Sequence, residues 1–299
     1  MADLTTRAVE AQLNAMGSQT FDVGVFIPSK DMMITKTWDK ETVLKSVGYL
    51  KYQNQRGAHI YVRPAGEHNL SMIDDLNRGG IETLRKGGVE PAAVVETSPG
   101  NFQAWVKHHK TLQKDVSTQV SKELASQYGG DPSSADWRHY GRLAGFTNCK
   151  PKYQQPNGYY PFVMLREARG QEYSTAPQRV AQAEQTLETR RAEEQQRRQQ
   201  FTEHTPASNP RATKTINDFR NDGRYGGDHH RIDLAYATYA LARGVSSKDV
   251  EGAIYTRDLS HKGPARRQDD YVQRTLSKAE ETIAMNPQRT QVKKNDLAR

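Results

Sequence analysis

Two adjacent carboxylates, Asp74 and Asp75, follow Ile73 at the end of an expected strand. Like charges held together repel each other unless a cation offsets them, so a buried pair of this kind indicates a site for Mg²⁺ or Mn²⁺. Neighbouring strand residues point to opposite faces, and both reach one site only where the chain turns. A competing interpretation is that the pair caps a helix that begins near Asn77.

Further carboxylates follow the expected helix stop at Gly129–Gly130, where Asp131 opens a turn and Asp136 lies five residues later. Phosphoryl transfer with two metal ions requires several carboxylates to converge, and these residues could supply them. The run Asp-Pro-Ser-Ser is equally typical of an ordinary turn. The sequence alone leaves both interpretations open.

Two segments carry groups that suit phosphate binding. Glu96–Trp105 leads from a strand into a turn that is dense in hydroxyl, amide and glycine groups, which can donate hydrogen bonds to phosphates. A plain turn with Trp105 in the core explains the same residues. Arg138–Lys150 combines three cations with His139 around two glycines, as a triphosphate site would. Solvated loops also carry Arg and Lys.

Other features exclude or weaken alternatives. Cys149 is the only cysteine, so neither an internal disulfide nor a zinc site with paired thiolates is possible. No GxxxxGK[ST] loop is present, which argues against a P-loop helicase. The pairs His108–His109 and His229–His230 have no partner at metal-ligand spacing, and we expect them on the surface.

Residues 1–175 alternate short strands and helices, which predicts an α/β or α+β domain with mixed or antiparallel sheets. Phe21–Val25 and Ile34–Trp38 predict a hairpin, and Asp39 is placed to cap a helix. Further strands are expected at four places, and a helix bearing Leu112, Val116, Val120 and Leu124 is expected as well. The expected strands are His59–Val62, Leu70–Ile73, Ala92–Glu96 and Phe162–Leu165.

The segment 176–211 changes character, because it is rich in helix-forming residues and poor in large apolar ones. We interpret it as a solvated spacer helix and linker. Residues 212–299 then show helical spacing around Ile232, Val250 and Leu276, with Ser246 as a cap, and end in a basic tail. This pattern predicts a small all-α helical bundle.

The net charge of +8 suits a polyanionic partner such as nucleic acid. No apolar run approaches the length of a membrane span, and the N-terminus has no signal-peptide core. We therefore expect a soluble, cytoplasmic protein with no membrane partner.

Taken in order, the motifs resemble the RepB-type replication primases of mobilisable plasmids, a branch of the archaeo-eukaryotic primase superfamily. The resemblance rests on four segments: His59–Pro64, Ile73–Leu76, Val94–Val106 and Ala135–Asn148. It implies a primase catalytic domain, with the helical C-terminal third resembling the family's bundle domain in pattern only.

The resemblance implies that Asp74, Asp75 and Asp131 are the catalytic, metal-binding aspartates, with Asp136 as a further metal ligand. Gln103 stands where the superfamily usually carries histidine, and glutamine is never charged. The implied cofactor is a pair of Mg²⁺ or Mn²⁺ ions, with no zinc. The expected nucleotide-binding residues are Tyr61, Arg63, Thr97, Ser98, Asn101, Gln103, Arg138, His139, Arg142 and Lys150.

The implied function is a DNA primase of plasmid replication, which makes primers from nucleoside triphosphates on single-stranded DNA at an initiation site. The expected partners are the template and plasmid or host replication proteins such as a helicase and a polymerase. Cations of the helical bundle are expected to contact template phosphates, although they also serve solubility. These cations are Arg257, Lys262, Arg266, Arg267 and Arg274.

Two alternatives remain. The chain could be a non-catalytic protein that binds single-stranded or origin DNA and keeps a primase-like fold, although the acids Asp74, Asp75 and Asp131 argue against this. It could also be the primase part of a longer relaxase-primase fusion.

Overall fold

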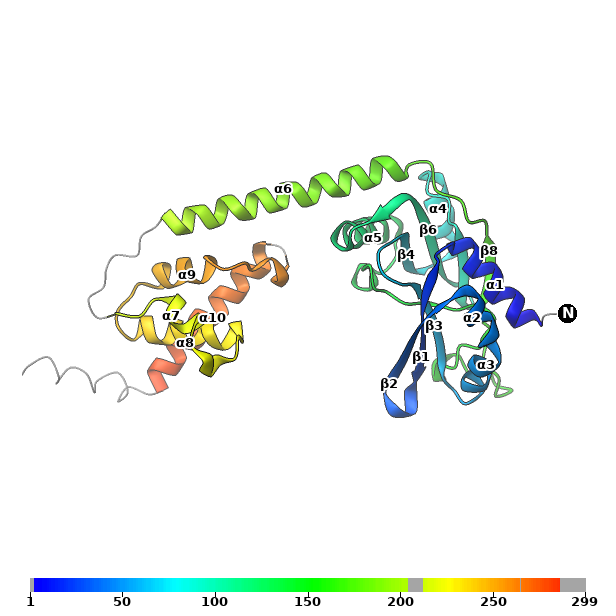
Figure 1. Cartoon of the computed structure of the whole chain (residues 1–299), viewed down its shortest axis with the longest axis horizontal. Coiled ribbons are helices and arrows are strands. Elements are labelled where there is room, and N and C mark those ends of the chain that lie inside the picture. The colour runs from blue at the N-terminus through cyan, green and yellow to red at the C-terminus, as the bar shows by residue number, and fades with distance from the viewer. Residues whose placement is uncertain (1–2, 204–211, 264, 286–299) are drawn as a thin grey trace, which may run out of the picture. The chain divides into compact units, whose positions relative to one another are not determined.

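The computed structural model describes residues 3–203, 212–263 and 265–285 (Figure 1). The chain divides into two compact units, Met1–Leu187 and Glu188–Arg299. The division falls inside helix α6 (Ala176–Glu203), which matches the expected spacer helix over most of its length. Residues 204–211 of the expected linker lie outside the described residues.

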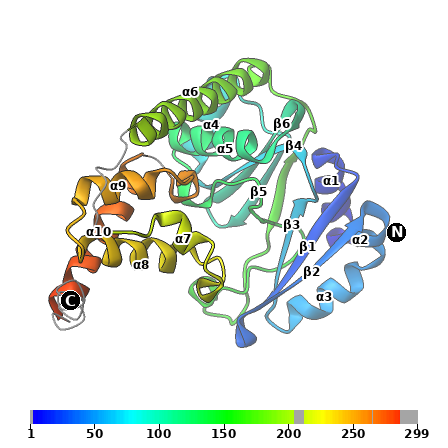
Figure 2. The ribbon, with the colours of Figure 1, turned by 60° about the vertical axis from the view of Figure 1, so that its left-hand side comes forward.

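The first unit contains two antiparallel four-stranded sheets, in the orders β2-β1-β3-β7 and β4-β6-β5-β8. Figure 2 shows α2 and α3 beside the first sheet and α4 and α5 beside the second. The strands are β1 (Thr20–Ile27), β2 (Met32–Asp39), β3 (His59–Pro64), β4 (His68–Leu76), β5 (Ala93–Ser98), β6 (Asn101–Leu112), β7 (Gly141–Arg142) and β8 (Met164–Ala168). The helices are α1 (Leu4–Met16), α2 (Lys40–Lys45), α3 (Val47–Gln55), α4 (Arg78–Lys86) and α5 (Lys114–Tyr128).

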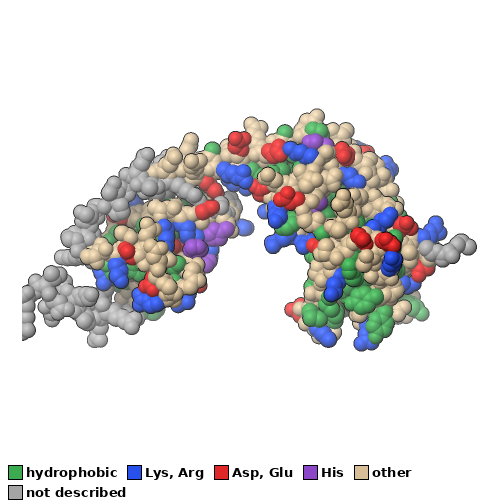
Figure 3. Space-filling model, viewed as in Figure 1, with side chains coloured by type: hydrophobic (Ala, Val, Ile, Leu, Met, Phe, Trp, Pro, Cys, Tyr) green, Lys and Arg blue, Asp and Glu red, His purple; other side chains and the backbone are tan. Residues whose placement is uncertain are grey.

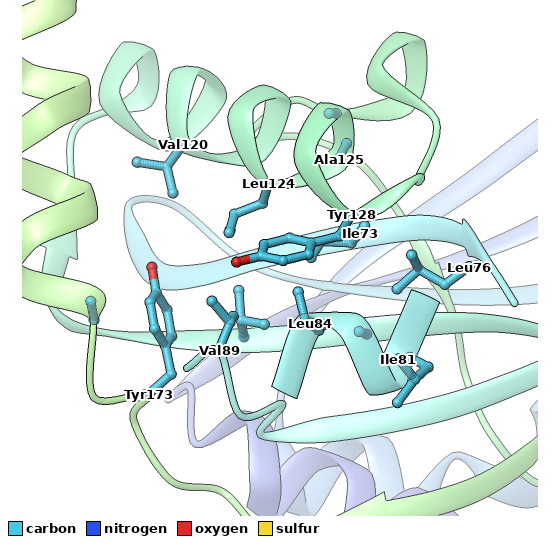
Figure 4. Packing of buried hydrophobic residues seen from close by; sticks show 14 of the residues in the cluster. Ile73, Leu76, Ile81, Leu84, Val89, Val120, Leu124, Ala125, Tyr128 and Tyr173 are labelled. Atoms are coloured by element: carbon cyan, nitrogen blue, oxygen red, sulfur yellow. The ribbon is translucent and has the colours of Figure 1, made fainter. Parts of the chain in front are cut away.

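Alternating residues of the second sheet serve two hydrophobic cores, because successive side chains of a strand point to opposite faces. Leu70 and Met72 of β4, with Trp105 of β6, join the core formed with the first sheet and α1. Ile73 and Leu76 point the other way, into a core covered by α4 and α5 (Figure 4). Strand β4 is therefore held on both faces.

The start of α6 belongs to this second core. Ala176, Val180 and Ala183 are buried in it, and Leu187 packs at its edge. The compact unit consequently extends past residue 175, where the sequence pattern placed the end of the catalytic domain.

Most expected elements of the first unit are present, with three differences. The helix capped by Asp39 is divided in two, α2 and α3, at Ser46. Helix α1 and the long strand β6 have no counterpart in the expectations. Leu112 ends β6 and does not belong to α5.

The expectation that His108 lies on the surface is wrong. Its side chain is fully buried, and both ring nitrogens have partners: Ser71 Oγ lies 2.8 Å from Nε2 and Tyr173 OH lies 3.0 Å from Nδ1. Burial lowers the pKa of His108 to about 3, with smaller contributions from His68 and His109. His109 is exposed, as expected.

The second unit is helical, with a core formed by α7 (Ile216–Arg220), α8 (His229–Leu241), α9 (Ser247–Tyr255) and α10 (Ala265–Met285). Ser246 caps α9 as expected, since its Oγ accepts a hydrogen bond from Asp249 N at 3.1 Å. Helix α7 was not expected. The basic tail after Met285 lies outside the described residues.

Within the described ranges, no helix combines the length and the apolar character that a membrane crossing requires.

We predict that His108 makes stability depend on pH. Its pKa in the folded protein lies below the ordinary value of 6.5, so the unfolded chain binds more protons as the pH falls between these values, and stability is lost in that window. The free energy of unfolding can be measured by denaturant titration at several pH values between about pH 6 and pH 4. His108→Gln should reduce the slope of this free energy against pH by about 1 kcal/mol per pH unit. The exposed neighbour provides the control: an equal reduction in His109→Gln would contradict this assignment.

Candidate active site

A cavity of about 490 Å³ is lined by residues of both sheets of the first unit. Tyr61 of β3 and Arg142 of β7 contribute from the first sheet, and Asp74 of β4 and Gln103 of β6 from the second. The cavity also brings together eight other residues named in the sequence analysis or adjacent to them: Asp75, Thr97, Asn101, Asp136, Arg138, His139, Asn148 and Lys150.

Strand β4 turns where its two carboxylates lie. Its register with β6 shifts between Ile73 and Leu76, and Asp75 has a φ of 57°. This irregular backbone lets adjacent residues line the same cavity, which a regular strand would prevent. The helix that follows is capped by Asn77, whose side chain accepts a hydrogen bond from Gly80 N at 2.8 Å. The carboxylates are thus not the cap of α4.

Neutral amides hold both carboxylates from the neighbouring strand β6. Gln103 Nε2 donates to Asp74 Oδ1 at 3.0 Å, and Asn101 Nδ2 donates to Asp75 Oδ1 at 2.9 Å. The other end of the Gln103 amide, Oε1, accepts a hydrogen bond from Arg142 N at 2.7 Å. Gln103 therefore connects the second sheet to the first, with both ends of its side chain engaged inside the protein.

Asp74 is poised as an ionised carboxylate. Burial alone raises its pKa, but the nearby His139 ring, the hydrogen bond from Gln103 and the hydrogen bond from the Asp75 backbone amide together outweigh burial, so that the net pKa of Asp74 is lowered. His139 Nε2 lies 3.7 Å from Asp74 Oδ2. The site consequently holds negative charge at neutral pH.

Arg142 carries the opposite charge into the same cavity. The residue is 3% exposed, and among the described residues neither Nη1 nor Nη2 has a hydrogen-bond partner. Its guanidinium lies over the Tyr61 ring, 4.7 Å from the centroid. Burial lowers the pKa of Arg142, yet a guanidinium stays charged at neutral pH. A buried cation without a hydrogen-bonding partner is costly and suits an anionic ligand.

Several lining residues were missed in the sequence. Lys152 and Tyr153 line the cavity, as do Tyr140 and Ser134. Lys152 and Tyr153 belong to a short 3-10 helix that follows the basic segment ending at Lys150, and continuing that basic run would have found Lys152. Asn148, which is buried, donates from Nδ2 to Thr97 O at 2.7 Å and so joins two walls of the cavity.

The structure does not bring the Asp131 carboxylate to the cavity lining. Its side chain accepts hydrogen bonds from the Ser133 and Ser134 hydroxyls at 2.7 Å, and these bonds, Ser133 first, lower the pKa of Asp131. The backbone of this turn is nevertheless fixed to the site, since Asp131 N donates to Asp74 O at 3.1 Å. Gly130 allows this approach, because a Cβ there would lie 2.5 Å from Ile73 Cγ2.

Arg63 and Ser98 also lie outside the cavity lining. Arg63 forms an ion pair with Asp22, with 2.9 Å between Nη2 and Oδ2, and donates from Nη1 to the Arg138 carbonyl at 2.6 Å. It therefore holds the loop that carries Arg138. Ser98 is buried and lines a neighbouring cavity.

Within the described parts of the chain, no group of three or more His, Cys, Asp or Glu side chains is arranged to hold a metal ion. Asp136 lines the cavity, but its Oδ1 accepts a hydrogen bond from Arg138 N at 2.6 Å. The carboxylates expected to bind metal are thus partly engaged with protein groups.

In the second unit, Arg257 was expected to contact template phosphates, but its charge is not presented to solvent. It forms a buried ion pair with Asp233, which also accepts a hydrogen bond from Tyr271 OH at 2.7 Å. The pair links α8 to the residues that follow α9. Lys262, Arg267 and Arg274 line a separate cavity of about 790 Å³, and Arg266 is exposed.

Comparison with known proteins places this geometry in a family. The model of the RepB DNA-primase N-terminal domain matches residues 29–193. Mobilization protein A of Escherichia coli is 37% identical over 287 residues, which are 92% of this chain but only 40% of that protein. A DNA primase of Acidithiobacillus ferrooxidans is 31% identical over 267 residues, covering 84% of this chain and 75% of that protein.

Two solved structures are similar over large parts of the chain. The crystal structure of primase RepB′ is 34% identical, with a TM-score of 0.67 and coverage of 99% of both chains. The catalytic domain of primase RepB′ in complex with initiator DNA is 42% identical, with a TM-score of 0.59, and covers 62% of this chain and 97% of that one. The chain therefore belongs to the RepB DNA-primase family, a family of nucleotidyltransferase enzymes.

Proposed function

We propose that the chain is a DNA primase of plasmid replication, which synthesises primers on single-stranded DNA at an initiation site by nucleotidyl transfer with two divalent metal ions. One observation carries this proposal: the buried guanidinium of Arg142, whose Nη1 and Nη2 have no hydrogen-bond partner in the described part of the chain, lines the same cavity as the carboxylates Asp74 and Asp75. Opposite charges placed on separate walls suit a ligand that is itself an anion bound to cations.

The nucleoside triphosphate would lie against the basic wall. Arg142 supplies two donors to phosphate oxygens, and Arg138, His139 and Lys150 line the same cavity. Thr97 and Asn101 add polar groups at its edge, and the Tyr61 ring supports the Arg142 guanidinium. Gln103 also lines the cavity, where its amide positions Asp74 and the Arg142 backbone.

The donor set fits Mg²⁺ or Mn²⁺, because these hard cations prefer carboxylate oxygens. Asp74 and Asp75 would hold the ions, with Asp136 from the opposite loop and Asp131 once its carboxylate leaves the Ser133 and Ser134 hydroxyls. When bound, the ions lower the pKa of the attacking 3′-hydroxyl and neutralise the triphosphate. No thiolate is available to favour zinc, since Cys149 does not line this cavity.

The template is proposed to contact the second unit through Lys262, Arg266, Arg267 and Arg274, without Arg257. The similarity to a primase catalytic domain solved with initiator DNA supports DNA at an initiation site as the partner, and we propose that this DNA is single-stranded. Replication proteins that extend the primer, such as a helicase and a polymerase, would act with the chain in the cytoplasm. The match to mobilization protein A, of which the chain spans 40%, supports the same module acting within a longer protein, and we propose that such a protein is a relaxase-primase fusion.

We predict that the carboxylates are essential for primer synthesis. Asp74→Asn and Asp75→Asn keep the shape of each side chain but remove the charge, so primer synthesis with labelled nucleotides and Mg²⁺ or Mn²⁺ should fall at least about 100-fold. Glu10→Gln, an exposed change on α1, should leave it unaffected. Full primer synthesis by both aspartate variants would refute the proposed site. If the wild type binds DNA but makes no primers, the chain would instead be a non-catalytic initiation protein.

We predict that Arg142 strengthens nucleotide binding but lowers the free energy of unfolding of the protein. In Arg142→Met the uncompensated buried charge is removed, so the free energy of unfolding should rise by about 1 kcal/mol or more while triphosphate binding is lost. The matched control is Arg63→Met, which breaks an ion pair with Asp22 and should destabilise the protein. Chemical denaturation and equilibrium nucleotide binding measure the two effects, and a destabilised Arg142→Met that still binds nucleotide would contradict the assignment.

The cations of the second unit should set part of the salt dependence of DNA binding. Arg266→Glu/Arg267→Glu removes two phosphate contacts, so the slope of log affinity against log salt should become shallower by about 1.4. Lys248→Glu, an exposed change on α9, provides the control. An unchanged slope in the double variant would assign these arginines to solubility.

A further inference from the structure

A second cavity of about 990 Å³ lies next to the candidate active site. The two cavities share walls: Thr97 lines the first and Ser98 the second, while Asn148 and Lys150 line the first and Cys149 the second. The second cavity, called here the aromatic groove, is lined by the loop 147–162, the Ser98–Pro99 turn, the end of α3 and the start of β8.

Large aromatic rings in this groove are exposed. Tyr159 is 72% exposed and Phe162 59%, and neither belongs to a hydrophobic core. Figure 3 also shows apolar side chains where α3 and the β1–β2 hairpin lie, but the exposed apolar residues of those elements, Met32, Met33, Tyr49 and Tyr52, do not line the groove. Exposed clusters of large apolar side chains usually mark a binding surface, because they gain free energy when covered.

Backbone hydrogen bonds hold the segment that carries these rings. Asn148 N donates to Pro161 O at 2.8 Å and Val163 N donates to Phe146 O at 2.7 Å, so Phe162 lies in a paired segment. Val163 is buried, which leaves Phe162 and Met164 on the outward side. At the loop tip, Gln155 N donates to Tyr159 O at 2.8 Å. A ligand that stacks on these rings would meet side chains carried by a hydrogen-bonded backbone.

The polar groups of the groove are mainly uncharged amides. Gln55 lines it from α3, and Gln155 and Asn157 line it from the loop. Asn54 lines it as well, but its buried amide is already hydrogen-bonded to Ala58 and Thr147. The Arg166 side chain also lines it, but its charge is already matched by Glu96, with which it forms an ion pair. The lysines of this loop, Lys150 and Lys152, lie on the side of the active-site cavity. Rings and amides in the groove, beside a neighbouring cavity lined by lysines, match nucleobases joined to a phosphate backbone.

From these observations we infer that the aromatic groove binds unpaired bases of the single-stranded DNA template beside the active site, by stacking on Tyr159 and Phe162. This inference rests on the proposed function, since a primase must hold its template next to the nucleotide. Stacking on a ring face tolerates any base, and the amides nearby can form hydrogen bonds to base edges. The shared wall then leads the template directly into the active-site cavity.

The test is equilibrium binding of labelled oligothymidylate to the full chain, without nucleotide or metal. Tyr159→Ala and Phe162→Ala should each weaken binding at least about five-fold, because base stacking on one ring contributes that much or more. Both side chains are exposed, so the variants should fold. Tyr159→Phe keeps the ring and should bind as the wild type does. Tyr52→Ala, a tyrosine 54% exposed on α3 but outside the groove, is the matched control.

Two further readouts separate base stacking from phosphate binding and from self-association. The alanine variants should lose no affinity for an abasic strand, and the salt slope should stay unchanged, since an aromatic ring releases no counterions. Wild-type affinity for oligothymidylate in both alanine variants would overturn the inference. So would a change of oligomeric state with unchanged DNA affinity, which would assign the groove to a second copy of the chain.

The same assay distinguishes failure of the groove from failure of the proposed function. Asp74→Asn should bind oligothymidylate normally while making no primers. In one outcome, the wild type binds oligothymidylate but makes no primers, while Tyr159→Ala binds the oligonucleotide more weakly. That result would support the groove and contradict the primase proposal. If primers are made normally by both alanine variants with unchanged template affinity, the groove is refuted and the primase proposal stands.

Discussion

The arrangement of the candidate active site depends on one buried side chain, Gln103. Its amide nitrogen holds a carboxylate of the second sheet and its amide oxygen holds the backbone of the first, at the residue whose cation lines the same cavity. An amide can do this because it donates at one end and accepts at the other, while a charged side chain cannot. The separation between the acidic and basic walls is therefore fixed by a neutral group that does not change with pH.

Several features around Gln103 lower the stability of the fold but serve the candidate active site. The irregular backbone at Asp75, the adjacent carboxylates and the unpaired Arg142 each carry a free-energy penalty, and all of them border one cavity. The two hydrophobic cores on either face of β4 offset that penalty, since Leu70 and Ile73 are fully buried on opposite sides of the strand. A rigid, well-packed strand thus ends in a strained and charged tip.

The sequence predicted much of this arrangement, and its failures have identifiable causes. Local patterns located the hairpin, most strands, the Ser246 cap and the Asp74–Asp75 pair. Strand β6 was missed because it carries buried polar residues, Gln103 and His108, that interrupt the alternation of apolar and polar positions. The pairings of Arg63 with Asp22 and of Arg257 with Asp233 join residues distant in the chain, and no local pattern shows which cation is already neutralised. For Asp131, the sequence offered both a turn and a metal ligand, and the side chain takes the turn.

Gly130 illustrates how tolerance to substitution is distributed around such a site. Any side chain there would collide with Ile73 and with the carbonyl of Asp74, 2.9 Å from where its Cβ would lie. Asp131, by contrast, is attached to β4 through its backbone amide, a contact that every residue except proline can make. Among related sequences, Gly130 should therefore be the residue of this turn that tolerates substitution least. The residues that follow it in the acidic loop should vary more.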